Sequence, residues 1–214
     1  MRKITKKFMQ KIKIILGTAH LSSTPGKRSP DGKFREYAYS RKVCREVAKR
    51  LREAGVDCVI DYEDDDMPGL TSSQELVKRV QIVNEIARKT DSLYVSIHVN
   101  ASAAKGWDKA SGFSIYTSPG ETKSDILATY IFDEATKLLK PIGKSLRKDM
   151  SDGDPDFEEN FYVLRKTICP AVLTENFFQN TKSDVEWLES EEGFKTVVAY
   201  HVNGILKYLN KTLF

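Results

Sequence analysis

The sequence is poor in cysteine and histidine, with only three of each in 214 residues. Cys44, Cys58 and Cys169 are odd in number, far apart and without a CxxC pair, which argues against a disulfide framework and against a zinc site built from cysteine. We expect three reduced thiols, two of them buried in core elements. No stretch approaches the roughly 20 apolar residues that a transmembrane helix needs, so no membrane span is predicted.

A large excess of charge of either sign is also missing. The net charge is +4, from 34 Lys and Arg against 30 Asp and Glu. No helix-turn-helix, zinc-finger or RNA-binding sheet motif accompanies this charge, so nucleic acid is not a predicted partner. Basic residues crowd the start, where we predict a basic N-terminal arm over residues 1–10, followed by a single folded domain over residues 11–214.

The basic start resembles the charged region of a secretion signal. Lys11 and Lys13 interrupt the apolar stretch that follows it, however, and no small-residue cleavage site comes after them. We therefore expect no cleavable signal peptide in this sequence. The protein would then stay in the cytoplasm until it is released, or would have lost an export signal.

Strand-like and helix-like runs alternate along the chain, which is typical of an α/β domain with a largely parallel sheet and helices on both faces. Short apolar runs predict strands at residues 11–17, 56–62, 93–99, 111–117, 161–165 and 169–175. Helical spacing predicts helices at residues 34–54, 73–89, 121–140 and 183–209, the last of them broken around Gly193. Gly55 is expected to cap the first helix.

Two segments of the chain are rich in acidic residues. Residues 63–73 begin with four consecutive acids, but the glycine and closing glutamate of a calcium-binding EF-hand are absent, so we expect a solvated loop. Residues 151–159 alternate acids with glycine and proline and are expected to form a mobile loop before the strand at 161–165.

Two of the three histidines lie where a predicted strand passes into a loop. His98 ends the apolar run 93–98, and His20 ends the run 12–20. The carboxyl ends of parallel strands meet at one edge of a sheet, where open α/β sheets bind their ligands. Two imidazoles and one carboxylate with an open fourth position form a catalytic zinc site. Glu36 is the candidate third ligand, because it opens the first helix directly after the loop that begins at His20.

A second carboxylate, Glu175, ends the apolar run 169–175 and is predicted to reach the same edge. It has the position of a base that lies near a metal-activated water without binding the metal. Each residue also has a plainer interpretation. Glu36 would favour the helix dipole in a first turn, and Glu175 could be an exposed strand end. His201, in the C-terminal helix, is expected to be structural or on the surface.

The chain carries several motifs in a fixed order: Gly17-Thr18-Ala19-His20, the helix start at Glu36, Arg79 with Asn84, Ser96-Ile97-His98-Val99-Asn100-Ala101, Phe161-Tyr162-Val163-Leu164-Arg165, and Pro170-Ala171-Val172-Leu173-Thr174-Glu175-Asn176-Phe177-Phe178-Gln179-Asn180. Together they resemble the zinc-dependent N-acetylmuramoyl-L-alanine amidases of the amidase-3 family over nearly the whole chain. The chain differs from the common pattern after His20, where Leu21, Ser22 and Ser23 replace glycines. It differs again where Asn176 and Phe177 replace a small residue and a glycine.

The resemblance implies a twisted, mostly parallel six-stranded sheet and a catalytic domain over residues 11–214. It implies one Zn²⁺ per chain, held by His20, Glu36 and His98, with Glu175 as the catalytic acid and base. The implied substrate is peptidoglycan, cut at the amide between N-acetylmuramic acid and L-alanine, as in an autolysin or endolysin.

Two alternatives remain open at this point. The first is a zinc peptidase or carboxypeptidase that cuts another cell-wall peptide bond, although the HExxH motif of the commonest metallopeptidases is missing. The second is a catalytically silent cell-wall-binding module. The roles of Arg79 and Asn84, the oligomeric state and the possible gating of the site by residues 151–159 do not follow from the sequence.

Overall fold

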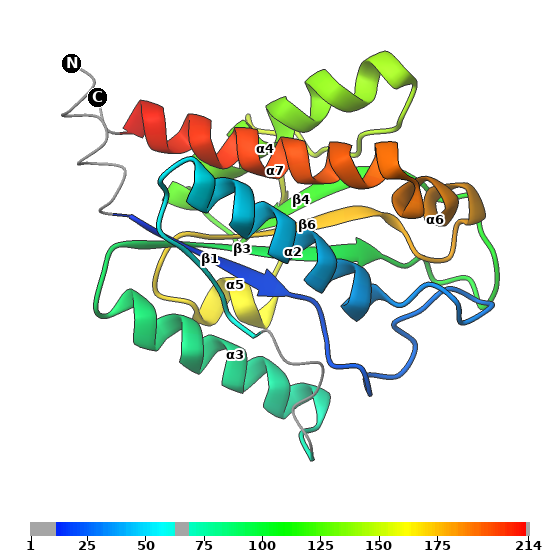
Figure 1. Cartoon of the computed structure of the whole chain (residues 1–214), viewed down its shortest axis with the longest axis horizontal. Coiled ribbons are helices and arrows are strands. Elements are labelled where there is room, and N and C mark those ends of the chain that lie inside the picture. Colours follow the sequence, from blue (N-terminus) through cyan, green and yellow to red (C-terminus); the bar gives the residue numbers. More distant parts are fainter. Residues whose placement is uncertain (1–11, 63–68, 213–214) are drawn as a thin grey trace.

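A computed structural model describes residues 12–62 and 69–212 of the chain (Figure 1). The predicted basic arm and the acidic residues 63–66 lie outside these residues. The described helices and strands are β1 (Lys13–Thr18), α2 (Glu36–Glu53), β2 (Cys58–Ile60), α3 (Ser72–Ala87), β3 (Ser92–Asn100), β4 (Phe113–Thr117), α4 (Lys123–Leu139), η1 (Lys140–Ile142), β5 (Phe157–Glu158), α5 (Tyr162–Lys166), β6 (Ala171–Phe178), α6 (Lys182–Glu189) and α7 (Glu191–Thr212).

The strands form one six-stranded sheet in the order β2-β1-β3-β6-β4-β5. All neighbouring strands are parallel except β4 and β6, which are antiparallel. Helices α2, α4 and α7 cover one face of the sheet, and α3 and α5 cover the other (Figure 1). The predicted fold class, a single α/β domain with a mostly parallel sheet between helices, is therefore confirmed.

The central strands are apolar along their whole length because both of their faces are buried. In β1, Ile14 and Leu16 pack into the larger core under α2, whereas Ile15 between them packs into the smaller core under α3. In β3, Val95 likewise packs into the larger core and Tyr94 into the smaller one. Side chains alternate between the faces of a strand, so a strand covered on both sides reads as a continuous apolar run.

The first helix, α2, ends at the predicted glycine but begins without a side-chain cap. Glu36 begins α2 without a side-chain cap from the preceding residue. Gly55 follows the helix with a φ of 84°, the left-handed conformation that glycine adopts without strain.

Helix α3 begins with a capping box between Thr71 and Gln74. None of the helices in the described part of the chain combines the length and apolar character needed to cross a bilayer.

The predicted strand at 161–165 is wrong, because these residues form the short helix α5. Adjacent residues Val163 and Leu164 are both buried against the same face of the sheet, which a helical turn allows and a strand does not. A five-residue apolar run has no periodicity by which to distinguish the two structures. The sixth strand is instead the two-residue β5, which lies inside the predicted mobile loop 151–159.

Part of the segment 151–159 is fixed to the sheet. Asp156 is 2% exposed, and its Oδ2 accepts a hydrogen bond of 2.5 Å from the Thr117 hydroxyl at the end of β4. The prediction of a loop therefore holds for residues 151–156, of which 151–153 are exposed, while residues 157–158 pair with β4.

The long C-terminal helix is broken three residues earlier than predicted. Helix α6 ends at Glu189, and α7 begins at Glu191 after Ser190. Gly193 lies inside the first turn of α7, where an added Cβ would lie 1.9 Å from the carbonyl oxygen of Trp187. The glycine thus permits the close approach of the two helices instead of forming the break.

Two of the three cysteines, Cys44 in α2 and Cys58 in β2, are buried, as expected, and all three thiols are free. His201 in α7 is also fully buried. Its Nδ1 contacts the carbonyl oxygen of Val197 at 2.8 Å, and its Nε2 contacts the Thr174 hydroxyl of β6 at 2.9 Å. Burial lowers the pKa of His201 to about 4, so the imidazole is neutral at neutral pH. His201 is therefore a structural residue that joins α7 to the sheet.

We expect His201 to make the protein less stable as the pH falls from about 6.5 to about 4. Over this pH range His201 binds a proton in the unfolded chain but not in the folded one. The free energy of unfolding therefore decreases as the pH falls, by up to about 3 kcal/mol in total. Denaturant unfolding of the wild type and of His201→Gln, measured at several pH values, tests this. The variant should show the shallower pH dependence, and identical slopes in the two proteins would contradict the prediction.

Candidate active site

Three of the four predicted site residues come together at the carboxyl edge of the sheet. His20 follows β1 by two residues, His98 is near the end of β3, and Glu36 is the first residue of α2. Glu36 Oε1 lies 3.1 Å from His98 Nδ1 and 3.5 Å from His20 Nε2, and one donor atom from each residue lies within 4.8 Å of the others. The two imidazole rings meet edge to face with centroids 5.0 Å apart. The cluster has the donor set of a catalytic zinc site.

The Glu36 carboxylate is 1% exposed and is held at both oxygens. Its Oε1 accepts a hydrogen bond of 3.2 Å from the Val99 amide, and its Oε2 accepts one of 3.3 Å from Gln179 Nε2. Burial by itself would raise the pKa of Glu36, but the hydrogen bonds and charges of His20 and His98 outweigh it and hold the pKa below its usual range. The carboxylate is therefore in the ionised form that binds cations.

His98 is supported by its neighbours in the strand and in β6. Its Nε2 lies 3.0 Å from the Ser96 hydroxyl, and its carbonyl oxygen accepts a hydrogen bond of 2.7 Å from Asn176 Nδ2. Burial lowers the pKa of His98 despite its hydrogen bond to Glu36. The ring is thus fixed in direction, as expected for a ligand whose second nitrogen is held by a polar group.

Glu175 stands beside this cluster without joining it. It lies in β6 opposite His98 in the parallel register of β3 and β6. Its Oε2 is enclosed and has no hydrogen-bond partner among the described residues. Burial, together with the charge of Glu36, raises the pKa of Glu175 well above its usual value. A carboxyl group with a free oxygen and a raised pKa is suited to taking up and returning a proton.

Of the two non-glycine residues with positive φ in the described chain, one belongs to this cluster and the other follows Glu175 by two residues. His20 has a φ of 45° and Phe177 a φ of 65°. The register of β3 and β6 shifts between His98 and Asn100, so β6 has one additional residue between Glu175 and Phe178. The Phe177 ring is fully buried and packs on Trp187 with centroids 4.8 Å apart, which offsets the backbone strain.

The cluster opens into a cavity of about 190 Å³. Both polar side chains and apolar side chains line it, the latter including residues of α3, α5 and β6. The lining residues are Thr18, His20, Lys27, Glu75, Leu76, Arg79, Ser96, His98, Phe161, Tyr162, Val163, Leu173 and Glu175. A concave site that combines apolar walls with a few convergent polar groups is typical of a substrate pocket.

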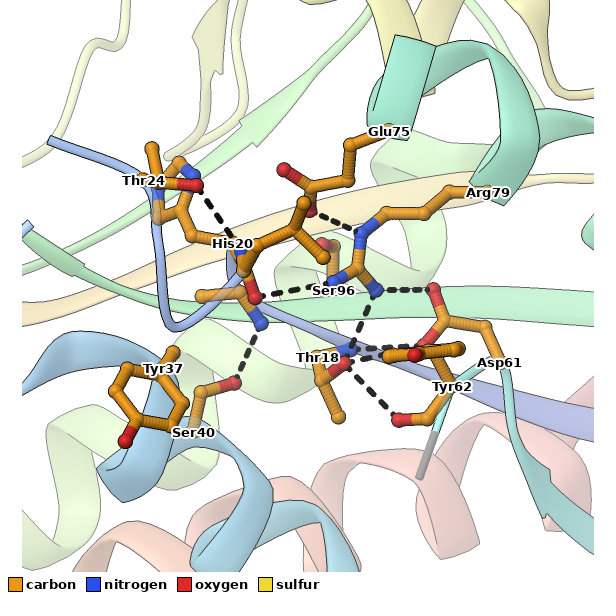
Figure 2. Close-up of polar contacts among 12 residues, drawn as sticks. Thr18, His20, Thr24, Tyr37, Ser40, Asp61, Tyr62, Glu75, Arg79 and Ser96 are labelled. Carbon is orange, nitrogen blue, oxygen red and sulfur yellow. Dashed lines mark hydrogen bonds and ion pairs between the residues drawn. The ribbon is translucent and has the colours of Figure 1, made fainter. Parts of the chain in front are cut away.

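A buried network of charged residues includes two residues that line this cavity, Glu75 and Arg79 (Figure 2). Arg79 on α3 pairs with Asp61 Oδ2 at 3.0 Å and with Glu75 Oε1 at 2.6 Å. The Tyr94 hydroxyl donates to the same Asp61 oxygen at 3.0 Å, and an added Cβ at Gly17 would lie 2.2 Å from that hydroxyl. Glycine at this position therefore makes room for the Tyr94 ring beneath the site.

Sequence reasoning missed several of these supporting residues. Asp61 directly follows β2 at the carboxyl edge, so the strand-end argument used for His20 and His98 could have found it. Gln179 carries no local signal that points to Glu36. Asn84 lies outside the site: its side chain bonds the carbonyl oxygen of Lys166 and the amide of Ile168, each at 2.9 Å, and thereby joins α3 to α5.

The fold and the clustered donors define an α/β domain with a candidate metal centre at the carboxyl edge of its sheet. A family model described as N-acetylmuramoyl-L-alanine amidase matches residues 14–207 of the chain. The chain therefore belongs to this amidase family, as its motifs predict.

Curated relatives agree with this assignment. The chain is 30% identical over 139 residues to the N-acetylmuramoyl-L-alanine amidase CwlM of Bacillus licheniformis, covering 65% of this chain and 49% of CwlM. It is 32% identical over 137 residues to the endolysin of Bacillus phage SPP1, covering 64% of this chain and 46% of the endolysin. The chain thus spans about half the length of these relatives.

The fold is also that of a solved amidase. The crystal structure of N-acetylmuramoyl-L-alanine amidase from Clostridium difficile 630 superposes with a TM-score of 0.76 and covers 94% of this chain and 97% of that one, at 23% identity. At this identity the likeness concerns the fold.

Proposed function

We propose that this domain is a zinc-dependent hydrolase that cuts the amide between N-acetylmuramic acid and L-alanine in peptidoglycan. The observation that carries the proposal is the convergence of His20, Glu36 and His98, whose donor atoms lie within 4.8 Å of one another beside the free oxygen of Glu175. Family membership supports the substrate, and the cavity above the cluster supports a bound ligand.

The three clustered residues fit a zinc ion. Two imidazoles and a carboxylate are a recurring catalytic donor set, and in this chain both oxygens of Glu36 already have partners that fix their direction. A zinc ion held by these residues would supply Lewis acidity, which lowers the pKa of water so that it can lose a proton and act as a nucleophile near neutral pH.

Glu175 performs the proton transfers in this proposal. Its unpartnered Oε2 accepts a proton from the attacking water, and the same carboxyl group returns it to the departing amine of L-alanine. The parallel register with His98 keeps Glu175 next to the ligands while its carboxylate stays outside their set. The apolar side chains of Phe161 and Leu173 line the same cavity as Glu175.

The proposal is tested by digesting purified peptidoglycan with the protein and analysing the soluble products by mass spectrometry, with and without a zinc chelator. We expect free stem peptides that begin with L-alanine, formed only in the absence of the chelator and restored by added Zn²⁺. Fragments cut at another peptide bond would favour the peptidase alternative. An absence of products in every sample would favour the binding module.

A further inference from the structure

The backbone of His20 is held in a conformation that an L-residue seldom adopts. Its φ of 45° is left-handed, although histidine has a Cβ that disfavours this region. In this conformation the imidazole Nε2 lies 3.5 Å from Glu36 Oε1. Strained backbone of this kind persists only where its surroundings hold it in place. The groups that bond the His20 backbone therefore decide where its imidazole lies.

Two buried guanidinium groups converge on the carbonyl oxygen of His20. Arg79 Nη2 from α3 and Arg41 Nη2 from α2 each donate a hydrogen bond of 3.3 Å to this oxygen. Both arginines are almost fully buried, at 2% and 1% exposed. Figure 2 shows the Arg79 guanidinium between the His20 carbonyl and the Asp61 carboxylate. A peptide carbonyl oxygen needs only one hydrogen-bond donor, whereas the carbonyl oxygen of His20 accepts hydrogen bonds from two charged side chains.

Arg79 is itself anchored to the strand that leads to His20. Its Nη1 donates to the Thr18 hydroxyl at 3.0 Å, and the Asp61 carboxylate that pairs with Arg79 also accepts a hydrogen bond of 3.0 Å from the Thr18 amide. Glu75 holds the Nε side of the guanidinium at 2.6 Å. The guanidinium thus spans Thr18 and His20, two residues apart, and fixes the turn of the chain between them.

We propose that Arg79 is a positioning residue of the metal site: by holding the His20 carbonyl together with Arg41, it keeps the left-handed backbone that directs the His20 imidazole toward Glu36 and His98. The inference rests on the proposed function, because it assigns a role toward the zinc ligands. Arg79 acts through the backbone of His20. The planar fork of arginine suits this task, because a lysine has one nitrogen and cannot reach Thr18, Asp61, Glu75 and His20 in the same directions.

The test compares Arg79→Lys with the wild type and with Asn84→Ala. Asn84 is on the same helix and joins α3 to α5, so its replacement weakens the structure without touching His20. Each protein is stripped of metal, and its dissociation constant for Zn²⁺ is measured by competition with a chromogenic chelator. The midpoint of denaturant unfolding is recorded in parallel.

We expect Arg79→Lys to bind Zn²⁺ about 10- to 100-fold more weakly, the usual effect of losing a residue that orients a metal ligand. Asn84→Ala should lower the unfolding midpoint and leave the dissociation constant unchanged. If Arg79→Lys fails to fold, Arg41→Lys removes the other donor to the same carbonyl, keeps the Arg79 ion pairs and should weaken zinc binding in the same direction.

The outcomes separate the two proposals. A wild-type protein that does not bind Zn²⁺ overturns the proposed function and this inference with it. Tight binding by the wild type together with an unchanged dissociation constant in the folded arginine variants overturns only the inference and leaves Arg79 as a residue of the fold. Equal weakening in Asn84→Ala would also overturn it, because general destabilisation would then explain the effect.

Discussion

Replacing Glu175 with glutamine should lower the rate of amide hydrolysis by about 10²- to 10⁴-fold, the usual contribution of a positioned acid or base. Glutamine has nearly the shape of glutamate but cannot take up the proton of the attacking water. Because Glu175 Oε2 has no partner within the described residues, the substitution breaks no hydrogen bond of that atom. The bound zinc should stay at the wild-type level, as measured by elemental analysis of the same preparation.

A matched control for this variant is Glu186→Gln on α6. The Glu186 side chain is 66% exposed and lies 4.0 Å from Lys182, a contact on the protein surface. Its replacement makes the same chemical change, from glutamate to glutamine, as Glu175→Gln does, and should leave the rate unchanged. A Glu175→Gln enzyme that keeps more than about a hundredth of the wild-type rate would contradict the acid and base role.

The His98→Ala substitution should have a different and larger effect, with loss of both zinc and activity. It removes one of three donors and leaves only His20 and Glu36, so we expect the zinc content to fall from one ion per chain to near zero after dialysis. It also leaves the buried Glu36 carboxylate without its 3.1 Å partner, which lowers the unfolding midpoint of the protein.

The control for this second variant is His201→Gln, which alters a buried histidine that bonds Thr174 and Val197 and not the three clustered residues. It should lose stability but keep its zinc, so that loss of metal is separated from loss of packing. Unchanged zinc content in both His98→Ala and His20→Ala would contradict the proposed ligands. Taken together, loss of rate with metal retained in Glu175→Gln and loss of metal in His98→Ala assign separate tasks to the two residues.

Much of the site can be predicted from the sequence, because its position follows from the topology of a parallel sheet. Parallel strands bring their carboxyl ends to one edge, so the ends of the apolar runs at His20, His98 and Glu175 could be assigned to one place without coordinates. Glu36 is harder to predict, because its approach depends on the path of the loop from residue 21 to residue 35. Its place at the start of the first helix, directly after that loop, made it the candidate third ligand, and the resemblance to the family implies the same role.

Other features depend on tertiary contacts that no local pattern reveals. The strand β5 has only two residues, too few for an alternating pattern of polar and apolar side chains. The apolar run at 161–165 forms a helix, in which the adjacent residues Val163 and Leu164 both pack into the smaller core. The partners of Arg79 lie 61 and 18 residues away in the chain, at Thr18 and Asp61. An isolated arginine on a helical pattern is usually solvated, so its burial could not be expected.

The order of the strands also indicates where this domain can tolerate changes in length. The two edge strands are very short, with three residues in β2 and two in β5, so each edge offers few free backbone groups to another chain. The strands that lead to His20, His98 and Glu175 are instead paired on both sides, and a shift of one residue in any of them would turn its side chains to the opposite face. Insertions should therefore be accepted at the β5 margin, in the exposed residues 151–153, and rejected in the three central strands and in β2, because Asp61 directly follows β2 and pairs with Arg79.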